Sequence, residues 1–298
     1  MTEHLDHVHC NNCREDKSKL LFTKNGFHIV KCQNCGLTYT NPRISASRAT
    51  DIYNSSYFQS QNSVVSGYDD YIRERPAIEA TFKKRVDFIM KNAPSLPKRE
   101  KPKILDIGCA TGFLLSIFRD MKWEVEGIEL SKFAQSFAVD EMHLPVHLGS
   151  LNSVDLEKDS FDLVTSWDVI EHSYNPKKDL LKIHHLLKVG GYLAVITPNR
   201  DSLHARLVGS RWVEYQKPEE HLYFFGHKIL SRILNDIGFE LAGSTTAGKY
   251  VKFSFALNRL RSYSEFFKIV EKMAGKRFAD KYIYVDPHDK MFLLFQKK

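Results

Sequence analysis

Blocks of apolar residues with two different spacings follow one another along the centre of the chain, and they predict strands and helices in alternation. Buried strands are predicted at 103–108, 124–130, 145–149, 161–170 and 192–199. Helices are predicted at 112–121, at 131–141 with Ser131 as its cap, and at 176–188, where Gly190 and Gly191 end it. Because the connections are short, this alternation predicts an α/β fold, a parallel sheet with helices on both faces.

Both ends of the chain depart from this repeat. A helix is predicted from about Asp69 to Asn92, and a linker rich in proline and charge follows it. After the last strand come an aromatic-rich insertion at 200–226, a helix at 227–239, a second helical insertion at about 255–274 and a final strand at 289–298. Ligands of such sheets bind at the carboxyl ends of the strands, so we expect the insertions to shape a substrate site.

Length and composition are those of a globular protein with a large core and an appendage, or with two domains: 298 residues, 43% hydrophobic and 27% charged. The chain has no apolar run of the roughly 18 residues that a membrane span requires. Its N-terminus lacks the basic start and apolar run of a signal peptide. We therefore expect a cytoplasmic protein with reduced thiols.

The net charge of +7 is spread unevenly. Residues 249–298 hold 12 Lys or Arg against 5 Asp or Glu, whereas residues 101–248 hold 16 against 20. The basic flanks suit an anionic partner such as nucleic acid, lipid or a phosphorylated substrate, and they equally suit a solvated helix surface.

The turn after the first predicted strand of the repeat, ILDIGCATGF, has the small residues of a nucleotide-binding loop. Counted from Gly108, the second and third glycines of a dinucleotide fingerprint are missing, and no Lys-Ser or Lys-Thr pair follows. Asp106 precedes Gly108 and suits a cationic ligand instead. Glu129 ends the next strand, where it can accept hydrogen bonds from both hydroxyls of a ribose. Together these residues predict S-adenosylmethionine, a sulfonium cation that carries a ribose.

Four segments in this order, ILDIGCATG, VEGIELS, FDLVTSWDVIEH and LLKVGGYLAVITPN, resemble class I S-adenosylmethionine-dependent methyltransferases over roughly residues 70–248. The resemblance implies a Rossmann-like, mostly parallel seven-stranded sheet. The first loop would line the amino-acid part of the cofactor, Glu129 its ribose, and Ser150 its adenine, although family members often have Asp at that position. The cofactor-binding residues expected are Asp106, Gly108, Ala110, Gly112, Glu129, Ser150 and Asp168.

Four of the five cysteines form two C-x2-C pairs separated by 18 residues. They are Cys10, Cys13, Cys32 and Cys35. This spacing predicts a closed, structural zinc site, because metal binding can replace the core that about 40 residues cannot build. Cys109 is interpreted as a small loop residue, neither a fifth ligand nor a nucleophile.

The pattern C-x2-C…C-x2-C-G-L…NPR, followed much later by W-x-x-Y-x-x-P-E-E-H-L-Y-F-F, resembles bacterial methyltransferases of sugar, polysaccharide and natural-product pathways. The organisation expected is a zinc ribbon at 1–42, a linker and helical lead-in at 43–100, and a methyltransferase domain at 101–298. Substrate-shaping insertions are expected at about 199–225 and 250–285.

Methyl transfer is an in-line displacement, and a general base assists it where the acceptor is a hydroxyl. His172, in the segment WDVIEH beside the expected methyl position, is the first candidate base, and His221 in the aromatic insertion is the second. Each histidine equally suits a structural hydrogen bond. Candidates for an acceptor wall, or for the core, are Trp212, Tyr215, Tyr223 and Phe224.

The pattern D-x-x-E-H in the same segment resembles the part of ubiquinone-biosynthesis O-methyltransferases that is thought to bind a divalent metal. Its ligands here would be Asp168, Glu171 and His172. We disfavour this metal, because Asp168 replaces the usual Glu and the Glu-His pair also occurs in metal-free relatives.

Three functions remain after these observations. The favoured one is methyl transfer, at oxygen, to a small polar acceptor such as a sugar or nucleotide-sugar. An rRNA or tRNA methyltransferase is the alternative, with the zinc ribbon and basic flanks holding RNA, although the ribbon lacks a dense Lys/Arg and aromatic pattern. The third is a scaffold without catalysis. The sequence predicts no oligomeric state.

Overall fold

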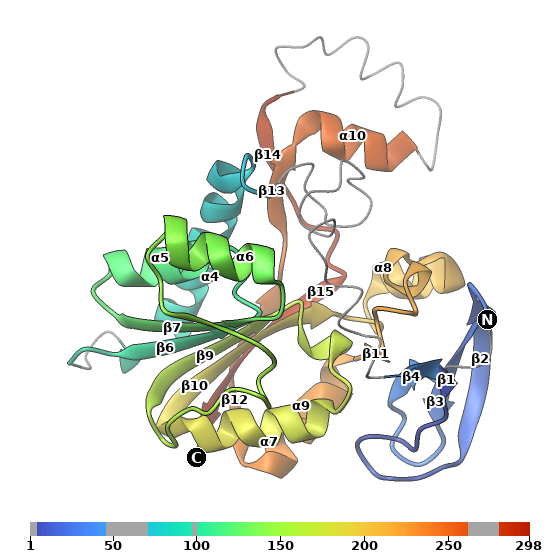
Figure 1. Cartoon of the computed structure of the whole chain (residues 1–298). Helices are drawn as coiled ribbons and strands as arrows, with labels where there is room; N and C mark the ends of the chain where they lie inside the picture. Colours follow the sequence, from blue (N-terminus) through green and yellow to red (C-terminus); the bar gives the residue numbers. More distant parts are fainter. Residues whose placement is uncertain (1–4, 46–70, 97–99, 262–279) are drawn as a thin grey trace.

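A seven-stranded sheet forms the centre of the molecule in the computed structural model, which describes residues 5–45, 71–96, 100–261 and 280–298 (Figure 1). Its strands are β6 (Lys103–Ile107), β7 (Glu124–Glu129), β8 (Val146–Leu148), β9 (Phe161–Trp167), β10 (Leu187–Pro198), β12 (Phe239–Thr246) and β15 (Lys290–Lys297). The spatial order is β12-β15-β10-β9-β6-β7-β8. Only the pairs that β15 makes in this sheet, with β10 and β12, are antiparallel. The predicted Rossmann-like, mostly parallel sheet is confirmed.

Helices cover both faces of this sheet. One face carries α4 (Arg75–Asn92), α5 (Phe113–Asp120) and α6 (Lys132–Ser136), and the other carries α7 (Pro176–Leu186) and α9 (His227–Ile237) (Figure 1). Successive residues of β10 pack into different cores: Leu193 and Val195 with the residues of α7 and α9, Ala194 with those of α4 and α5. Because neighbouring side chains of a strand point to opposite faces, a sheet covered twice needs apolar residues at nearly every position.

Two details of the helices differ from the predictions. Gly190 and Gly191 do not end α7, because Leu187 is already extended and starts β10. The two glycines instead lie inside β10, where its register against β9 shifts between Leu187 and Tyr192. Ser131 does stand at the N-cap of α6, but its side chain makes no capping hydrogen bond.

The lead-in helix and the second insertion are described only in part. α4 begins at Arg75 with Pro76 in its first turn, and the predicted start near Asp69 lies outside the described residues. In the second insertion the structure describes β13 (Lys249–Lys252), α10 (Phe253–Arg261) and β14 (Tyr282–Val285), whereas residues 262–274 of the predicted helix lie outside. The sequence pattern did not reveal β12, an edge strand whose residues are mostly exposed and small or polar.

The N-terminal module is a small antiparallel sheet that includes a strand from far along the chain. Its own strands are β2 (Ser18–Lys24), β3 (Phe27–Cys32) and β4 (Thr38–Thr40), with a separate pair formed by β1 (Leu5–Asp6) and β5 (Arg43–Ile44). β11 (Tyr223–Phe224), from the aromatic insertion, pairs with β4 and completes the order β11-β4-β3-β2. The rest of the insertion forms α8 (Leu203–Val208) and two short 3-10 turns (Gly209–Arg211 and Val213–Gln216).

Among the helices that the structure describes, none combines the length and the apolar character needed to cross a membrane.

Candidate active site and metal centre

The loop predicted to bind the cofactor connects β6 to α5. Gly108 and Gly112 have φ values of +71° and +80°. A Cβ at Gly108 would lie 2.6 Å from Val169 Cγ2, and a Cβ at Gly112 would collide with Leu144. Both positions therefore require glycine. Ala110 also has a positive φ, and its N–H donates to Glu129 Oε2 at 2.9 Å, which fixes the loop against the end of β7.

Two buried carboxyl groups, Asp106 and Glu129, lie near the carboxyl ends of β6 and β7 beside this loop. Asp106 Oδ1 accepts a hydrogen bond from the Thr165 hydroxyl at 2.6 Å, and Glu129 Oε1 accepts one from the Ser131 N–H at 2.8 Å. Burial raises the pKa of both groups, that of Asp106 to about 7, and the charge of Glu129 adds to the rise at Asp106. A nearby cation would stabilise both carboxylates, so this pair fits the cationic, ribose-bearing S-adenosylmethionine.

Ser150 lies in an exposed turn just beyond β8. Its N–H donates to Ser153 Oγ at 2.8 Å, and the Ser153 hydroxyl donates to the Ser150 carbonyl at 2.9 Å. The N–H of Gly149 donates to the Glu129 carbonyl at 2.8 Å. The structure thereby brings Ser150 next to the acid that is predicted to hold the ribose.

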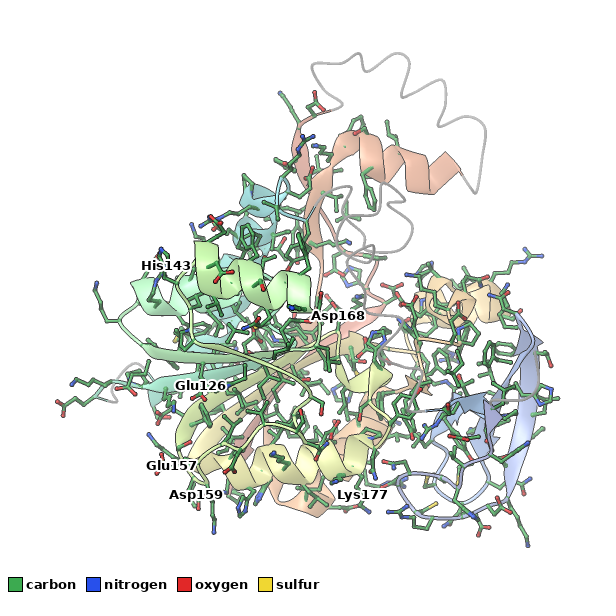
Figure 2. The ribbon with its side chains drawn as sticks, in the orientation of Figure 1. Glu126, His143, Glu157, Asp159, Asp168 and Lys177 are labelled. Atoms are coloured by element: carbon green, nitrogen blue, oxygen red, sulfur yellow. The ribbon has the colours of Figure 1, made fainter. Side chains whose placement is uncertain are left out.

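Asp168 follows β9 and forms an ion pair with Lys290, whose Nζ lies 2.6 Å from Asp168 Oδ1. Lys290 reaches this place because β15 is antiparallel to its neighbours, so its first residue lies at the carboxyl ends of the parallel strands. Desolvation opposes both charges, but their attraction outweighs it, and the pKa of Asp168 is lowered while that of Lys290 is raised. Figure 2 labels Asp168 at the end of the central sheet, on the side where α8 and the N-terminal module lie.

Glu171 lies in a 3-10 turn, Ile170–His172, and is buried. Its Oε2 accepts a hydrogen bond from the Thr197 hydroxyl at 3.0 Å. Burial, together with the charge of Asp168, raises the pKa of Glu171 to about 8, so the group is largely protonated at neutral pH. The ammonium group of Lys290 binds the Asp168 carboxylate, and among the described residues Asp168, Glu171 and His172 do not gather as a group of metal ligands. Within the described ranges, the four cysteines alone form a group of three or more metal ligands.

The two candidate bases, His172 and His221, are in direct contact. Their ring centroids lie 4.7 Å apart and the rings are perpendicular. His172 Nδ1 lies 3.0 Å from the Glu220 carbonyl, so Nδ1 carries the proton and Nε2 carries the lone pair. Burial lowers the pKa of His172 to about 4 and that of His221 well below its ordinary value. Both rings are therefore neutral at physiological pH.

Glu214 is a neighbour of this pair that the sequence pattern did not reveal. It lies in the turn Val213–Gln216, and its Oε2 is 3.4 Å from His221 Nδ1. Lys290 is equally unmarked in the sequence, although it binds Asp168. Glu214 and Lys290 both lie far from the segment WDVIEH along the chain. A local sequence pattern does not indicate which distant charged residue will contact a given side chain.

The four aromatic residues proposed as an acceptor wall are buried, with exposed fractions between 0% and 5%. Trp212 donates from Nε1 to Asp289 Oδ2 at 3.0 Å, and Tyr215 packs edge-on against Phe22 of the N-terminal module, with ring centroids 4.9 Å apart. Tyr223 and Phe224 form β11. The structure supports the core interpretation for all four, because they fill the contact between the insertion and the N-terminal sheet.

A pocket of about 380 Å³ opens at the same edge of the central sheet. It is lined by Asn199, His227, Ser244, Thr245, Thr246, Lys290 and Met291. Six of these seven side chains can form hydrogen bonds, and none is acidic. Lys290 lines this pocket and also binds Asp168, so the pocket adjoins the charged cluster around the two histidines.

The cysteines of the two C-x2-C pairs meet in the N-terminal module, with all four Sγ atoms within 4.8 Å of one another. The Cys10–Cys35 and Cys13–Cys32 Sγ distances are 3.4 and 3.5 Å. Four thiolates about 2.3 Å from a tetrahedral Zn²⁺ lie roughly 3.8 Å apart, so the cluster fits zinc after a small expansion. Cys109 lies much later in the sequence, in the loop after β6. It is buried there and is not part of the cluster.

Comparisons with known proteins agree with this geometry. A family model described as a methyltransferase domain matches residues 71–242. The ubiquinone biosynthesis O-methyltransferase of Rhodopseudomonas palustris (strain HaA2) is 29% identical over 157 residues, which cover 46% of this chain and 62% of that protein. Its counterpart from strain TIE-1 is 31% identical over 129 residues, 41% of this chain and 51% of that one. The chain thus spans little more than half the length of these relatives.

Solved structures resemble the fold. A putative sarcosine dimethylglycine methyltransferase from Galdieria sulphuraria has a TM-score of 0.53 and 14% identity, with 74% of this chain and 86% of that chain covered. A putative methyltransferase from Bacillus halodurans has a TM-score of 0.51 and 15% identity, with 70% and 98% covered. The family model spans more than half of the chain and the sheet has the expected order, so this protein belongs to the class I S-adenosylmethionine-dependent methyltransferases.

Proposed function

We propose that this chain transfers the methyl group of S-adenosylmethionine to an oxygen atom of a small polar acceptor, such as a sugar or nucleotide-sugar. The observation that carries the proposal is the contact between His172 and His221, at the edge of the sheet where Asp106 and Glu129 also lie. An acceptor hydroxyl must lose its proton when it is methylated, and a neutral imidazole can take that proton.

The cofactor would be held by the loop after β6 and by the two buried acids. Asp106 would face its amino-acid part and Glu129 its ribose hydroxyls, while Ser150 would lie beside the adenine. When bound, S-adenosylmethionine supplies an electrophilic methyl group on a sulfonium. Glycine at positions 108 and 112 allows the left-handed turns of the loop and its close packing against Val169 and Leu144.

His172 is the better placed of the two bases. Its tautomer is set by the hydrogen bond from Nδ1 to the Glu220 carbonyl, so Nε2 can accept a proton. The low pKa keeps the ring unprotonated, and the hydroxyl becomes strongly acidic as its oxygen gains the methyl group. His221, with Glu214 beside it, would support the resulting imidazolium or take the proton itself.

The pocket lined by Lys290 supports the proposed class of acceptor. Its amide, imidazole, hydroxyl and ammonium groups match a ligand rich in hydroxyl or phosphate oxygens rather than an apolar one. The ubiquinone biosynthesis relatives align with about half of this chain, so a phenolic hydroxyl is included among the acceptors to be tested.

The test is a transfer assay with methyl-labelled S-adenosylmethionine and separate pools of nucleotide-sugars, phenolic hydroxyl compounds and purified tRNA and rRNA. Label should enter the nucleotide-sugar pool and be found as an ether. Exclusive labelling of RNA would overturn the assignment in favour of an RNA methyltransferase. No labelling of any pool, together with tight cofactor binding, would favour a scaffold.

The role of the histidines is tested on the acceptor so found. His172→Gln should lower kcat by about a hundredfold or more, the usual contribution of a general base, with cofactor affinity unchanged. His185→Gln is the matched control, because His185 is an exposed histidine of α7. Full turnover in both His172→Gln and His221→Gln would remove the pair from the mechanism.

A further inference from the structure

The N-terminal module is hydrogen-bonded to the segment that carries His221. β4 pairs with β11 in antiparallel register, Tyr39 opposite Tyr223. Beyond this pair, the Thr40 N–H donates to the Leu222 carbonyl at 3.0 Å, and the Thr40 hydroxyl donates to the His221 carbonyl at 3.1 Å. Thr40 is completely buried, so water cannot replace these bonds.

The same segment is bound on its other side to the turn that carries His172. The Leu222 N–H donates to the Glu171 carbonyl at 2.9 Å, and the Glu220 carbonyl accepts from His172. Residues 220–222 thus lie between β4 and the turn Ile170–His172. A continuous series of hydrogen bonds runs from Thr40 through the backbone of His221 and Leu222 to the other histidine.

The cysteine cluster sets where β4 begins. Cys32 ends β3, and its N–H donates to the carbonyl of Leu37, the residue before β4, at 2.9 Å. Both cysteine loops are also bound to helices of the large sheet: Arg232 of α9 donates to the Cys35 carbonyl at 2.8 Å, and Lys177 of α7 donates to the Asn12 carbonyl at 2.9 Å. Figure 2 shows Lys177 at the end of α7 that faces this module.

We propose that Thr40 is a positioning residue. Through Thr40, the N-terminal module that contains the four cysteines holds His221 against His172. This proposal deepens the proposed function and rests on it for the catalytic meaning of the pair, but the structural coupling can be measured without any acceptor. Metal binding in the module would then keep β4 in place, and β4 would keep the two rings at their contact distance.

The first experiment compares zinc-loaded wild-type protein with Thr40→Val, which keeps the shape of the side chain and removes its hydroxyl. Imidazole nitrogen NMR signals are assigned with His172→Gln and His221→Gln, and then followed against pH. In Thr40→Val we expect both ring signals to shift and the pKa of His172 to rise from about 4 toward its ordinary value as the pair loosens. The zinc content should stay at one per chain.

Two variants separate positioning from a general structural effect. Thr40→Ser restores the hydroxyl and should restore the histidine signals. Thr23→Val changes an exposed threonine on β2 of the same sheet and should leave them unchanged. Unchanged histidine signals in Thr40→Val would overturn the proposal, and so would a shift of equal size in Thr23→Val.

A second measurement needs no variant. Chelation of zinc from wild-type protein should reproduce the shift of the histidine signals, increase amide exchange in residues 220–225, and leave exchange in residues 103–107 unchanged. Readdition of zinc should reverse both changes. Histidine signals that stay the same after verified loss of zinc would overturn the coupling.

The outcomes also separate this proposal from the proposed function. Shifted signals in Thr40→Val, combined with full turnover in both histidine variants, would keep the coupling and remove the catalytic role. On the acceptor found by the transfer assay, Thr40→Val should lower kcat about tenfold with little change in KM, and Thr40→Ser should recover it. A fall in kcat with unshifted signals would contradict positioning through the pair.

Discussion

At the scale of single residues, burial sets the protonation of the site. It raises the pKa of Asp106 and Glu171 and lowers that of both histidines. Asp106, Glu129 and the two histidines were recognisable in the sequence because each lies at a predicted strand end or in a distinctive motif. Their burial and contacts were not, since these depend on segments that fold over them.

Asp106 makes cofactor affinity depend on pH. Its pKa is about 7 in the free protein, and a bound sulfonium would lower it, so binding releases a proton and becomes tighter as pH rises through 7. Calorimetry of S-adenosylmethionine at pH 6, 7 and 8 should show this trend in wild-type protein and a weaker one in Asp106→Asn. Asp236→Asn, an exposed acid of α9, serves as the control and should follow wild type. Equal slopes in all three proteins would contradict the assignment.

The lowered pKa of His172 makes the folded state less stable at acid pH. Its pKa is lowered from 6.5 to about 4 by burial, so the neutral ring contributes stability above pH 6.5 that is lost as pH falls through 4. For a partly exposed ring we expect a contribution on the order of 2 kcal/mol. Urea unfolding between pH 7 and 4 should show that His172→Gln loses less stability than wild type. A parallel loss in both proteins would show that the ring is not held neutral.

At the scale of elements, the alternation of strand and helix predicted the central sheet because most of its central strands have a largely apolar, buried core and the helices between them show a helical spacing. The sequence pattern did not predict β12 and β11, for two different reasons. β12 is an exposed edge strand of small and polar residues, and β11 has two residues and pairs with a strand about 185 residues earlier in the chain. Neither leaves a local pattern.

A substitution at Gly112 tests whether the loop between β6 and α5 binds the cofactor. Gly112→Ala combines a φ of +80° with a collision against Leu144, and should weaken cofactor binding about tenfold by displacing the loop. Gly26→Ala is a matched control, because Gly26 has a φ of +83° and a Cβ there would have no other atom within 4 Å. Equal cofactor affinity of the two variants, measured by calorimetry, would show that the loop after β6 does not form the binding site.

At the scale of the whole molecule, the N-terminal module is joined to the segment that carries His221, one of the two candidate bases. Its strand β4 is paired with the aromatic insertion, and Arg43 donates to the Tyr223 hydroxyl at 2.8 Å in a buried contact. The spacing of the cysteines predicted a structural metal site, but not that its sheet would be completed by the segment after His221.

The carboxyl edge of this sheet is expected to bind S-adenosylmethionine, and calorimetry on Glu129→Ala measures that binding at the residue predicted to hold the ribose. Loss of charge-assisted hydrogen bonds to the ribose, each worth about 1.5–3 kcal/mol, should weaken binding at least tenfold. Glu124→Ala, an exposed acid at the opposite end of β7, should bind like wild type. Wild-type affinity in Glu129→Ala would contradict the account.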